Sequence, residues 1–330
     1  MAEIKYDVIA IGNAIVDIIG RCNDAFLAKH GATKGRMQLV DAETVQKLYA
    51  DMGPGVEISG GSAANTMVGI ASFGGSAAFI GKVADDEFGR IFAHDIQAAG
   101  VAFTTPPAKG GAPTARSLIL VTPDGERTMN TFLGVSPELD PGEVDAGLIG
   151  SAQIVYLEGY LFDRPEAKAA FRRAATIAKT QGRQVALTLS DAFCVDRHRA
   201  EFLELIKSEV DILFANESEI TALYKSQSFE DAARRARGDT RLAVLTRGAK
   251  GSVIFAGDKA TTIAPEIVHR VVDTTGAGDL FAAGFLYGLS TAKSLETCGR
   301  LGSIAAAEVI GHVGARPETP LARLAQQRGI

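Results

Sequence analysis

The sequence contains few cysteines, and the three that it has lie far apart. Cys22, Cys194 and Cys298 form no CxxC pair, and their number is odd. A zinc site or a disulfide framework is therefore disfavoured, because both require closely spaced or paired cysteines. We expect a protein of the reducing cytoplasm, where thiols stay free.

The sequence also lacks a long apolar segment and an excess of positive charge. No run approaches the ~18 apolar residues that cross a membrane, and the start, MAEIKYDVIAIGN, has no apolar stretch typical of a signal peptide. The formal net charge is −5 and no block of Lys and Arg occurs, whereas nucleic-acid binding requires a basic face. We therefore expect neither a membrane nor a nucleic acid as a partner.

Short apolar runs that predict buried strands alternate with stretches that predict helices. Hydrophobic residues make up 46% of the 330 residues, enough for a large core. Strands that alternate with helices predict a doubly wound, mostly parallel sheet with right-handed crossovers. We expect strands at 6–11, 79–83, 154–157, 185–189, 212–215 and 242–245, and helices at 62–73, 87–99, 165–181 and 280–289.

Two segments break this alternation and predict a small second unit. Residues 15–60 and 101–132 are richer in Gly, Pro and Thr. Within the second segment, two extended runs flank the turn 123–125, which is the pattern of a β-hairpin. We expect a β-rich lid made of these segments. The α/β core, with the ATP and catalytic sites, would then consist of 1–14, 61–100 and 133–330.

The most specific motif is DTTGAGD, residues 273–279, which follows the β-branched run 267–272. We expect that run to be a strand, so that the motif turns from a strand into a helix. Gly276 and Gly278 permit close approach of the backbone to a ligand, and the free amides of a helix start form an anion pocket. Asp279 would lie beside the pocket, where a carboxylate can accept the proton of an attacking hydroxyl. A lone GAGD would suit a plain helix cap, but the full motif favours phosphoryl transfer.

Two other phosphate-binding motifs do not fit the sequence. A Rossmann GxGxxG motif would need glycine at position 281, where Phe281 stands. A Walker A loop has the form GxxxxGK[ST]. The nearest match, from Gly75 to Gly81 and Lys82, has one spacer too many and continues with Val83. A dinucleotide fold and a P-loop are therefore both disfavoured.

Polar residues follow the first predicted strand and open the first long helix. Asn13 and Asp17 interrupt an apolar run at the sheet edge where ligands of such folds bind. The carboxylate of Asp17 can accept two hydrogen bonds from a vicinal diol, although a plain turn is an equal alternative. The helix start GGSAAN is a candidate substrate-binding segment, in which Gly61, Ser62 and Asn65 would face the ligand. The alternative is a simple capped helix terminus with a solvated Asn.

Two further motifs follow predicted strands in the second half of the chain. Asn216 and Glu219 are three apart and share a helix face, and an amide with a carboxylate suits Mg²⁺. The alternative is a helix cap with an acidic first turn. The segment 246–251, TRGAKG, has glycines and cations that can line nucleotide phosphates, or it is a hairpin turn with a solvated Lys250.

Taken in this order, the motifs resemble the ribokinase (PfkB) family of carbohydrate and nucleoside kinases over nearly the whole chain. The resemblance implies a doubly wound core with a β lid, and transfer of the γ-phosphoryl group of ATP to an alcohol. It implies Asp279 as the catalytic base and Mg²⁺ ordered by Asn216 and, through water, by Glu219. The amides of Gly276, Ala277 and Gly278 would form the anion hole.

The same resemblance implies a nucleotide site in the second half of the chain. Residues 311–316, GHVGAR, are a candidate for the adenine pocket. The resemblance leaves open whether K⁺ is a further cofactor. It also leaves open whether the protein is a monomer or a homodimer. ATP would contact Asn216, Thr246, Arg247, Gly248, Gly251 and Thr275.

Within the family, the sequence is most similar to the adenosine kinases, which implies phosphorylation of the 5′-hydroxyl of adenosine to AMP in purine salvage. Asp17 would hold the ribose diol and Arg116 would close over the phosphates. Adenosine kinases usually have two adjacent aromatics where this chain has Tyr160 and Leu161, so the choice of base stays open. A ribokinase-like or fructokinase-like sugar kinase, or a non-catalytic sensor on this fold, are the alternatives. The substrate site would comprise Asn13, Asp17, Gly61, Ser62, Asn65, Arg116 and Tyr160.

Overall fold

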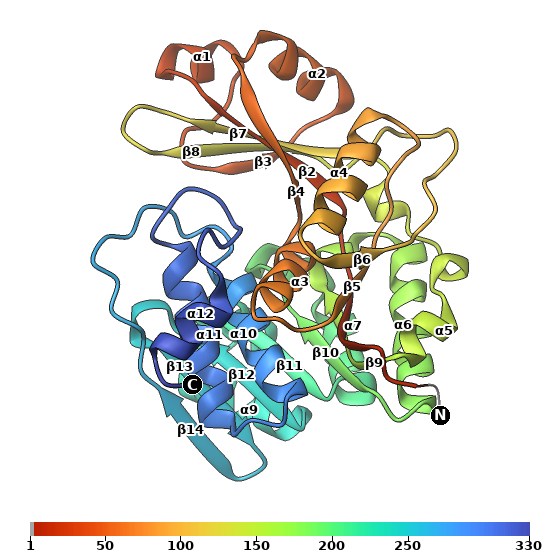
Figure 1. Cartoon of the computed structure of the whole chain (residues 1–330), viewed down its shortest axis with the longest axis vertical. Helices are drawn as coiled ribbons and strands as arrows, with labels where there is room; N and C mark the ends of the chain where they lie inside the picture. Colours follow the sequence, from red (N-terminus) through yellow and green to blue (C-terminus); the bar gives the residue numbers. More distant parts are fainter. Residues whose placement is uncertain (1–2) are drawn as a thin grey trace.

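A nine-stranded sheet forms the centre of the protein, for which the computed structural model describes residues 3–330 (Figure 1). Its strands, in spatial order, are β14 (Lys259–Ile263), β13 (Ser252–Ala256), β12 (Leu242–Thr246), β11 (Ile212–Asn216), β10 (Gln184–Thr188), β9 (Ala152–Glu158), β1 (Tyr6–Ile11), β5 (Ala77–Ile80) and β6 (Val101–Phe103). The strands from β12 to β6 are parallel, and β13 and β14 extend the sheet antiparallel at one edge.

Helices cover both faces of this sheet, because successive side chains of its central strands point to opposite faces. Val8 of β1 packs in one core with Phe285, and Ile9 packs in a second core with Phe171. The first core is covered by α3 (Ser62–Ser72), α4 (Glu87–Ala98), α10 (Ala277–Ser290) and α11 (Leu295–Val309), with α12 (Leu321–Gln327) packed outside them. The second is covered by α5 (Ala146–Gly150), α6 (Pro165–Thr180), α7 (Ala192–Glu209), α8 (Glu217–Tyr224) and α9 (Phe229–Asp239). Short 3-10 helices occupy Ser136–Glu138, Pro141–Glu143, Gly159–Asp163 and Gly248–Lys250.

Within residues 3–330, no helix is both long and apolar enough to cross a membrane.

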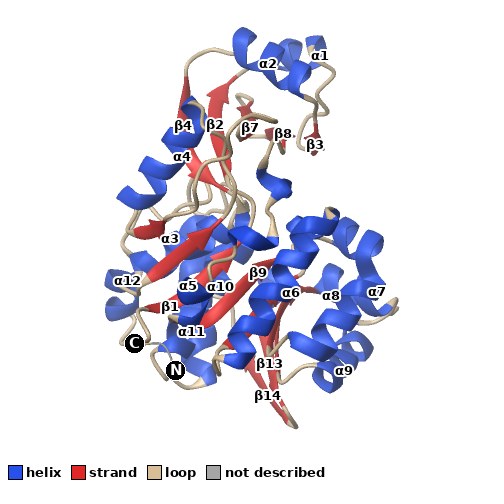
Figure 2. Ribbon diagram, turned by 90° about the vertical axis from the view of Figure 1, so that its right-hand side faces the viewer, coloured by secondary structure: helices blue, strands red, loops and turns tan. Residues whose placement is uncertain are grey.

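A smaller five-stranded sheet stands above the carboxyl ends of the parallel strands and forms the lid (Figure 2). Its spatial order is β3 (Met37–Leu39), β8 (Arg127–Phe132), β7 (Ala115–Val121), β2 (Ile15–Arg21) and β4 (Gly55–Gly60), with α1 (Asp24–Lys29) and α2 (Ala42–Asp51) on its outer side. Val16 and Ile18 of β2 are buried with Leu48 of α2. Since side chains alternate along a strand, Asp17 faces the opposite way, toward the α/β core.

The predicted fold class is confirmed, with a mostly parallel sheet between two helical layers and a small β-rich lid. The predicted hairpin is present as β7 and β8, which pair antiparallel. One border of the lid is wrong in the prediction. Residues 101–103 form β6, which pairs with β5 in the large sheet, so the second lid segment begins with β7.

The predicted strand at 267–272 is also wrong. This β-branched run lies in an extended loop between β14 and α10, and Ile267 and Val271 are exposed. The loop forms no ladder with β14, which is the edge strand of the sheet. The loop instead contacts the end of α11, where the N–H of Val272 donates to the carbonyl of Ile310 at 2.8 Å. The DTTGAGD motif therefore connects a loop, not a strand, to a helix.

Candidate active site

The glycine-rich turn 276–279 opens α10 beneath the lid. Gly276 has a φ of +80°, which L side chains rarely adopt. A Cβ atom there would also approach the Cβ of Ala315 to 2.7 Å. Both restrictions require glycine at 276, and they place Gly278 and Asp279 in the first turn of the helix.

The amides of this turn are largely free for a ligand. Among the described residues, no acceptor is found for the N–H groups of Gly276, Gly278 or Asp279. The N–H of Ala277 donates to the carbonyl of Thr274 at 3.2 Å, so the structure removes Ala277 from the predicted anion hole. The remaining amides point outward from the start of a 14-residue helix, where the helix dipole favours negative charge.

Asp279 is held by the first turn of α3. The hydroxyl of Ser62 donates to its Oδ1 at 2.6 Å, and the Nδ2 of Asn65 donates to its Oδ2 at 3.2 Å. Burial raises the pKa of Asp279, while both hydrogen bonds and the charge of Arg316 act in the opposite direction. The two helices approach closely because Gly69 of α3 lies against Ala283 of α10; a Cβ at 69 would be only 2.5 Å from that side chain.

Asn13 does not line the predicted substrate site with a free amide. It is 2% exposed, its Nδ2 donates to Glu158 Oε1 at 2.8 Å, and its Oδ1 accepts from the hydroxyl of Ser136 at 2.9 Å. Glu158, which the sequence reasoning missed, also accepts the N–H of Ala63 at 2.8 Å and so fixes the start of α3. Burial raises the pKa of Glu158 to about 7. The polar groups of Asn13 and Glu158 therefore bind each other and fix the backbone at the start of α3, instead of binding a ligand.

Asp17 lies on the lid strand that faces the core. Its carboxylate occupies the space above Gly60, where a Cβ atom would come within 2.2 Å of an Oδ atom. Burial raises the pKa of Asp17 to about 7, the positive charges of Arg316 and Arg127 oppose this rise, and Asp279 adds to it. The lid carboxylate and the predicted base are therefore close enough for their charges to interact across the two units.

Tyr160 is the member of the 160–162 run that lies close enough to Asp279 to interact with its charge. It follows β9, its N–H donates to the hydroxyl of Ser190 at 3.2 Å, and its own hydroxyl donates to the Ser190 carbonyl at 3.3 Å. Burial raises its pKa, and Asp191 and Asp279 contribute to the rise. Leu161 and Phe162 are buried in the core on the other face of the sheet, so neither can stack on a ligand.

The structure does not bring Arg116 to the catalytic groups. Arg116 lies on the lid face that α4 covers, with its guanidinium carbon 4.8 Å from the centre of the Phe88 ring. The alternation of β7 places its neighbour Ser117, not Arg116, in register with Asp17. A different lid arginine reaches the core: Arg127 of β8 forms an ion pair with Asp273, the first residue of the DTTGAGD motif.

The ion pair of Arg127 and Asp273 is expected to hold the lid against the core. The two side chains are only 8% and 5% exposed, and Asp273 also accepts hydrogen bonds from Thr275 and from the N–H of Gly314. Replacing Arg127 by Gln would leave a buried carboxylate without its cation, at a cost of about 3 kcal/mol. We expect a lower melting temperature and an acceptor KM raised about tenfold, with Arg36→Gln, an exposed lid arginine, as the control. Unchanged values for both quantities would rule out this role.

A pocket of about 690 Å³ adjoins the turn and suits a nucleotide. Thr246, Gly248 and Gly251 line it as predicted, and it reaches Gly278. The other predicted contacts do not line it. Arg247 turns away to Glu217 at 3.2 Å and stacks on Phe229, and the hydroxyl of Thr275 donates to Asp273 at 2.8 Å, so Thr274 takes its place in the wall. No residue of the predicted adenine segment 311–316 is among the described residues that line it; Ile310, directly before the segment, is.

Asn216 and Glu219 form a reciprocal helix cap. The Oδ1 of Asn216 accepts the N–H of Glu219 at 2.9 Å, and Glu219 accepts from both nitrogens of Asn216. Burial raises the pKa of Glu219 to about 7. Among residues 3–330, no cluster of three or more His, Cys, Asp or Glu side chains could hold a metal. A metal here would therefore depend on water and on the ligand for most of its coordination.

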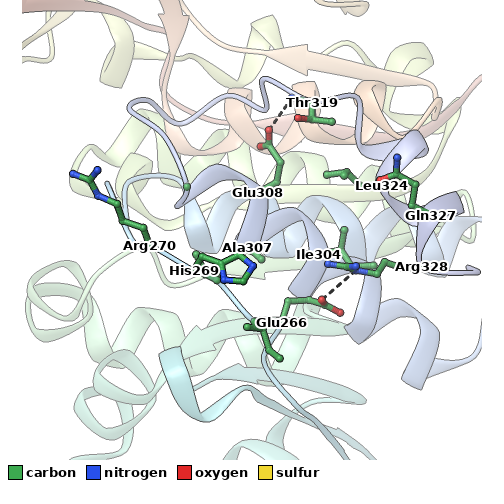
Figure 3. Close-up of a pocket in the computed structure, with 13 residues that line it drawn as sticks. Glu266, His269, Arg270, Ile304, Ala307, Glu308, Thr319, Leu324, Gln327 and Arg328 are labelled. Carbon is green, nitrogen blue, oxygen red and sulfur yellow. Dashed lines mark hydrogen bonds and ion pairs between the residues drawn. The ribbon is translucent and has the colours of Figure 1, made fainter.

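A second hollow of about 430 Å³ lies on the other side of the 264–272 loop, between that loop, α11 and α12 (Figure 3). Glu266 pairs with Arg328 across it at 3.4 Å, and Glu308 accepts the N–H of Thr319 at 2.7 Å. Of the residues predicted for the site, only Gly311, the first residue of the adenine candidate segment 311–316, is among the described residues that line it. The loop thus separates this hollow from the nucleotide pocket.

Comparison with known proteins agrees with this geometry. The sequence matches the family model of the pfkB family carbohydrate kinases over residues 37–322. A structure described as a probable sugar kinase from Rhizobium etli is 51% identical, with a TM-score of 0.92 and 99% of both chains covered. A structure of adenosine kinase from Sinorhizobium meliloti is 53% identical, with a TM-score of 0.91, covering 98% of this chain and 99% of that one. An uncharacterized sugar kinase from Archaeoglobus fulgidus is 32% identical over 77% of this chain and 98% of its own length.

Proposed function

Since the chain belongs to the pfkB family of carbohydrate kinases, enzymes that transfer a phosphoryl group to an alcohol, we propose that it phosphorylates the 5′-hydroxyl of adenosine with ATP, giving AMP and ADP. The observation that carries the proposal is the turn 276–279, where Asp279 stands beside unbonded amides at the end of a nucleotide-sized pocket. The 53% identity to the Sinorhizobium meliloti adenosine kinase supports adenosine as the acceptor. Such a reaction would serve purine salvage.

In the proposed reaction, the acceptor lies between the lid and the core. Asp17 accepts hydrogen bonds from the two hydroxyls of the ribose, and Tyr160 packs against the base. Asp279, held by Ser62 and Asn65, accepts the proton of the 5′-hydroxyl as that oxygen attacks the γ-phosphorus. The amides of Gly276 and Gly278 stabilise the transferring phosphoryl group. Positioning and preorganised charge supply most of the rate enhancement in this chemistry.

The lid excludes water while this transfer takes place. Its contact with the core through Arg127 and Asp273 closes the cleft around the reacting groups. Water would otherwise compete with the acceptor as the nucleophile, and its removal strengthens local electrostatics. Mg²⁺, when bound with ATP, would neutralise phosphate charge, and Glu219 would orient one of its waters.

A sugar kinase of the same family is the second candidate. Two of the similar proteins described above are sugar kinases by name, and Asp17 would bind the diol of a sugar as readily as that of a nucleoside. Leu161, where adenosine kinases usually have a second aromatic, also weakens the case for base stacking. The two candidates differ in whether the site recognises a base.

A coupled assay of ADP release over a panel of acceptors separates the candidates. Adenosine, inosine, ribose, fructose and a sugar acid should be tested at equal concentrations with MgATP. We expect adenosine to give the highest kcat/KM, and a product that co-migrates with AMP. A sugar as the best acceptor would replace the adenosine assignment by the sugar kinase, and turnover of no acceptor would favour a non-catalytic sensor.

The ionisation of Asp17 predicts a pH-dependent acceptor affinity. Its pKa is raised to about 7 by burial, so the carboxylate that binds the diol is lost as the pH falls through that value. We expect the acceptor KM to be about tenfold higher near pH 6 than near pH 8. Asp17→Asn should abolish this dependence and raise the acceptor KM by about 30-fold, the cost of one charge-assisted hydrogen bond. The KM for ATP serves as the internal control, and an equal rise in both values would refute the role of Asp17.

A further inference from the structure

Arg316 is held in the site by the same contacts that fix the catalytic turn. It belongs to the segment that follows α11, and the N–H of Gly314 in this segment donates to Asp273 at 3.1 Å. Ala315 packs against Gly276. The backbone of Arg316 is therefore fixed relative to the turn that carries Asp279, although 37 residues separate the two in sequence.

A chain of hydrogen bonds leads from Arg316 to Asp279. The Nε of Arg316 donates to the Oδ1 of Asn65 at 2.8 Å, and the Nδ2 of Asn65 donates to Asp279 at 3.2 Å. A guanidinium group can only donate. Asn65 must therefore present its oxygen to Arg316 and its nitrogen to Asp279. Because Asn65 is only 5% exposed, water has little room to replace Arg316 in this task.

The other end of the guanidinium is anchored to the strand that leads into α3. The Nη2 of Arg316 donates to the carbonyl and to the hydroxyl of Ser59, and Asp95 of α4 accepts the N–H and the hydroxyl of the same serine. The side chain of Arg316 is thus tied to β4 and to α3 at once. This forked geometry requires a guanidinium, since an ammonium group has no such planar pair of donors.

The charge of Arg316 acts on three carboxylates. Asp95, Asp17 and Asp279 all interact with it, and its burial lowers its own pKa to about 10. The remaining ionisable groups that interact with Asp279 are acidic or phenolic. They are Asp17 of β2, Tyr156 and Glu158 of β9, Tyr160 of the 3-10 helix and Glu219 of α8. Arg316 is the cation that opposes them at Asp279.

We infer that Arg316 is a positioning residue for phosphoryl transfer, which orients the Asn65 amide against Asp279 and places a positive charge near this buried carboxylate. The inference rests on the proposed function, because it gives Asp279 the role of the base. It assigns to the GHVGAR segment a task at the acceptor and the base, where the sequence suggested the adenine pocket. The signal that could have found it is a single arginine in a glycine-rich turn, which is too common to be specific.

The test compares Arg316→Gln, Arg316→Lys and the remote exposed control Arg323→Gln by their pH profiles of kcat/KM. Arg316→Gln keeps a donor for Asn65 but removes the charge, so kcat should fall roughly 30-fold and the acidic limb should move up by about one pH unit. The sign follows because loss of a nearby cation raises the pKa of Asp279, whose protonated form cannot act as a base. Arg316→Lys should lower kcat but leave the acidic limb in place.

A double variant separates positioning from a general structural effect. If Arg316 acts through Asn65, Asn65→Ala combined with Arg316→Gln should have nearly the same kcat as Asn65→Ala alone. Fully multiplicative losses would overturn the positioning role, and an unmoved acidic limb in Arg316→Gln would overturn the role of its charge. Should Arg316→Gln fail to fold, Arg316→Lys decides, and wild-type kcat in that variant would refute the inference. Absence of turnover in the wild-type protein would instead refute the proposed function.

Discussion

Asp279→Asn is expected to lower kcat by about 10³- to 10⁴-fold, the contribution of a well-placed general base. The substitution keeps the size and shape of the side chain. The amide oxygen can still accept the hydrogen bond from Ser62, now seen at 2.6 Å. The variant loses the group that accepts the proton of the attacking hydroxyl, and with it the acceptor for the Nδ2 of Asn65, now seen at 3.2 Å. The KM values for ATP and for the acceptor should therefore stay within a few-fold of the wild-type values.

The same variant should stay within about 1 kcal/mol of the wild-type stability at neutral pH, because relief of a buried charge opposes the loss of the hydrogen bond from Asn65. Burial raises the pKa of Asp279 in the folded protein. A carboxylate with a raised folded-state pKa contributes its full stability at low pH and loses it as the pH rises through that pKa. Asparagine does not ionise and avoids this loss. Thermal unfolding near pH 7.5 provides the measurement.

A matched control distinguishes loss of the base from loss of a carboxylate in general. Asp258→Asn changes a fully exposed carboxylate in the turn between β13 and β14, which pairs with Arg237 at the surface. We expect wild-type kcat in this control. A kcat for Asp279→Asn close to that of Asp258→Asn would show that another group accepts the proton.

The catalytic turn could be predicted from the sequence because its chemistry is local. The glycines, the helix start and Asp279 are contiguous, and the physical requirements of the turn act within a few residues. Gly276 illustrates this, since its φ of +80° is a property of the backbone that glycine alone tolerates well. The alternation of strands and helices is likewise a local pattern, and it sufficed to predict the doubly wound core.

The partners of the catalytic groups could not be predicted because they come from distant segments. Glu158 and Arg316 contact Asn13 and Asn65 across 145 and 251 residues. No periodicity relates such positions, so only the fold identifies them. The lid arginine was misassigned for a related reason. Arg116 and Arg127 lie on neighbouring strands, and the register of β7 with β2 decides which face each side chain takes.

The loop 264–272 shows how tertiary structure can overrule a local preference. Its β-branched residues favour a strand, but the loop lies against the end of α11, where the N–H of Val272 donates to the carbonyl of Ile310. The chain uses these exposed apolar residues as a wall instead. Ile267, Val268 and Val271 line the nucleotide-sized pocket, so the loop forms part of the pocket and not a strand of the sheet.

Gly278 allows the amide pocket to be tested without disturbing the fold. A Cβ at this position would meet no protein atom within 4 Å, and the residue is exposed at the end of the nucleotide-sized pocket. Its φ is not positive, so alanine is conformationally acceptable. Alanine in the first turn of α10 should even favour the helix slightly, by up to about 1 kcal/mol.

Gly278→Ala should therefore keep the wild-type melting temperature but lose about 10²- to 10³-fold in kcat, comparable to the removal of one oxyanion-hole donor. The added methyl group would stand in front of the free N–H groups, where the phosphoryl group must approach closely. Gly238→Ala is the matched control, because Gly238 lies in α9 with similarly open space. Gly276→Ala should differ by also destabilising the protein, by about 1–3 kcal/mol from backbone strain. If Gly278→Ala turned over like Gly238→Ala, the phosphoryl group would have to bind elsewhere, and the proposed role of the turn would be wrong.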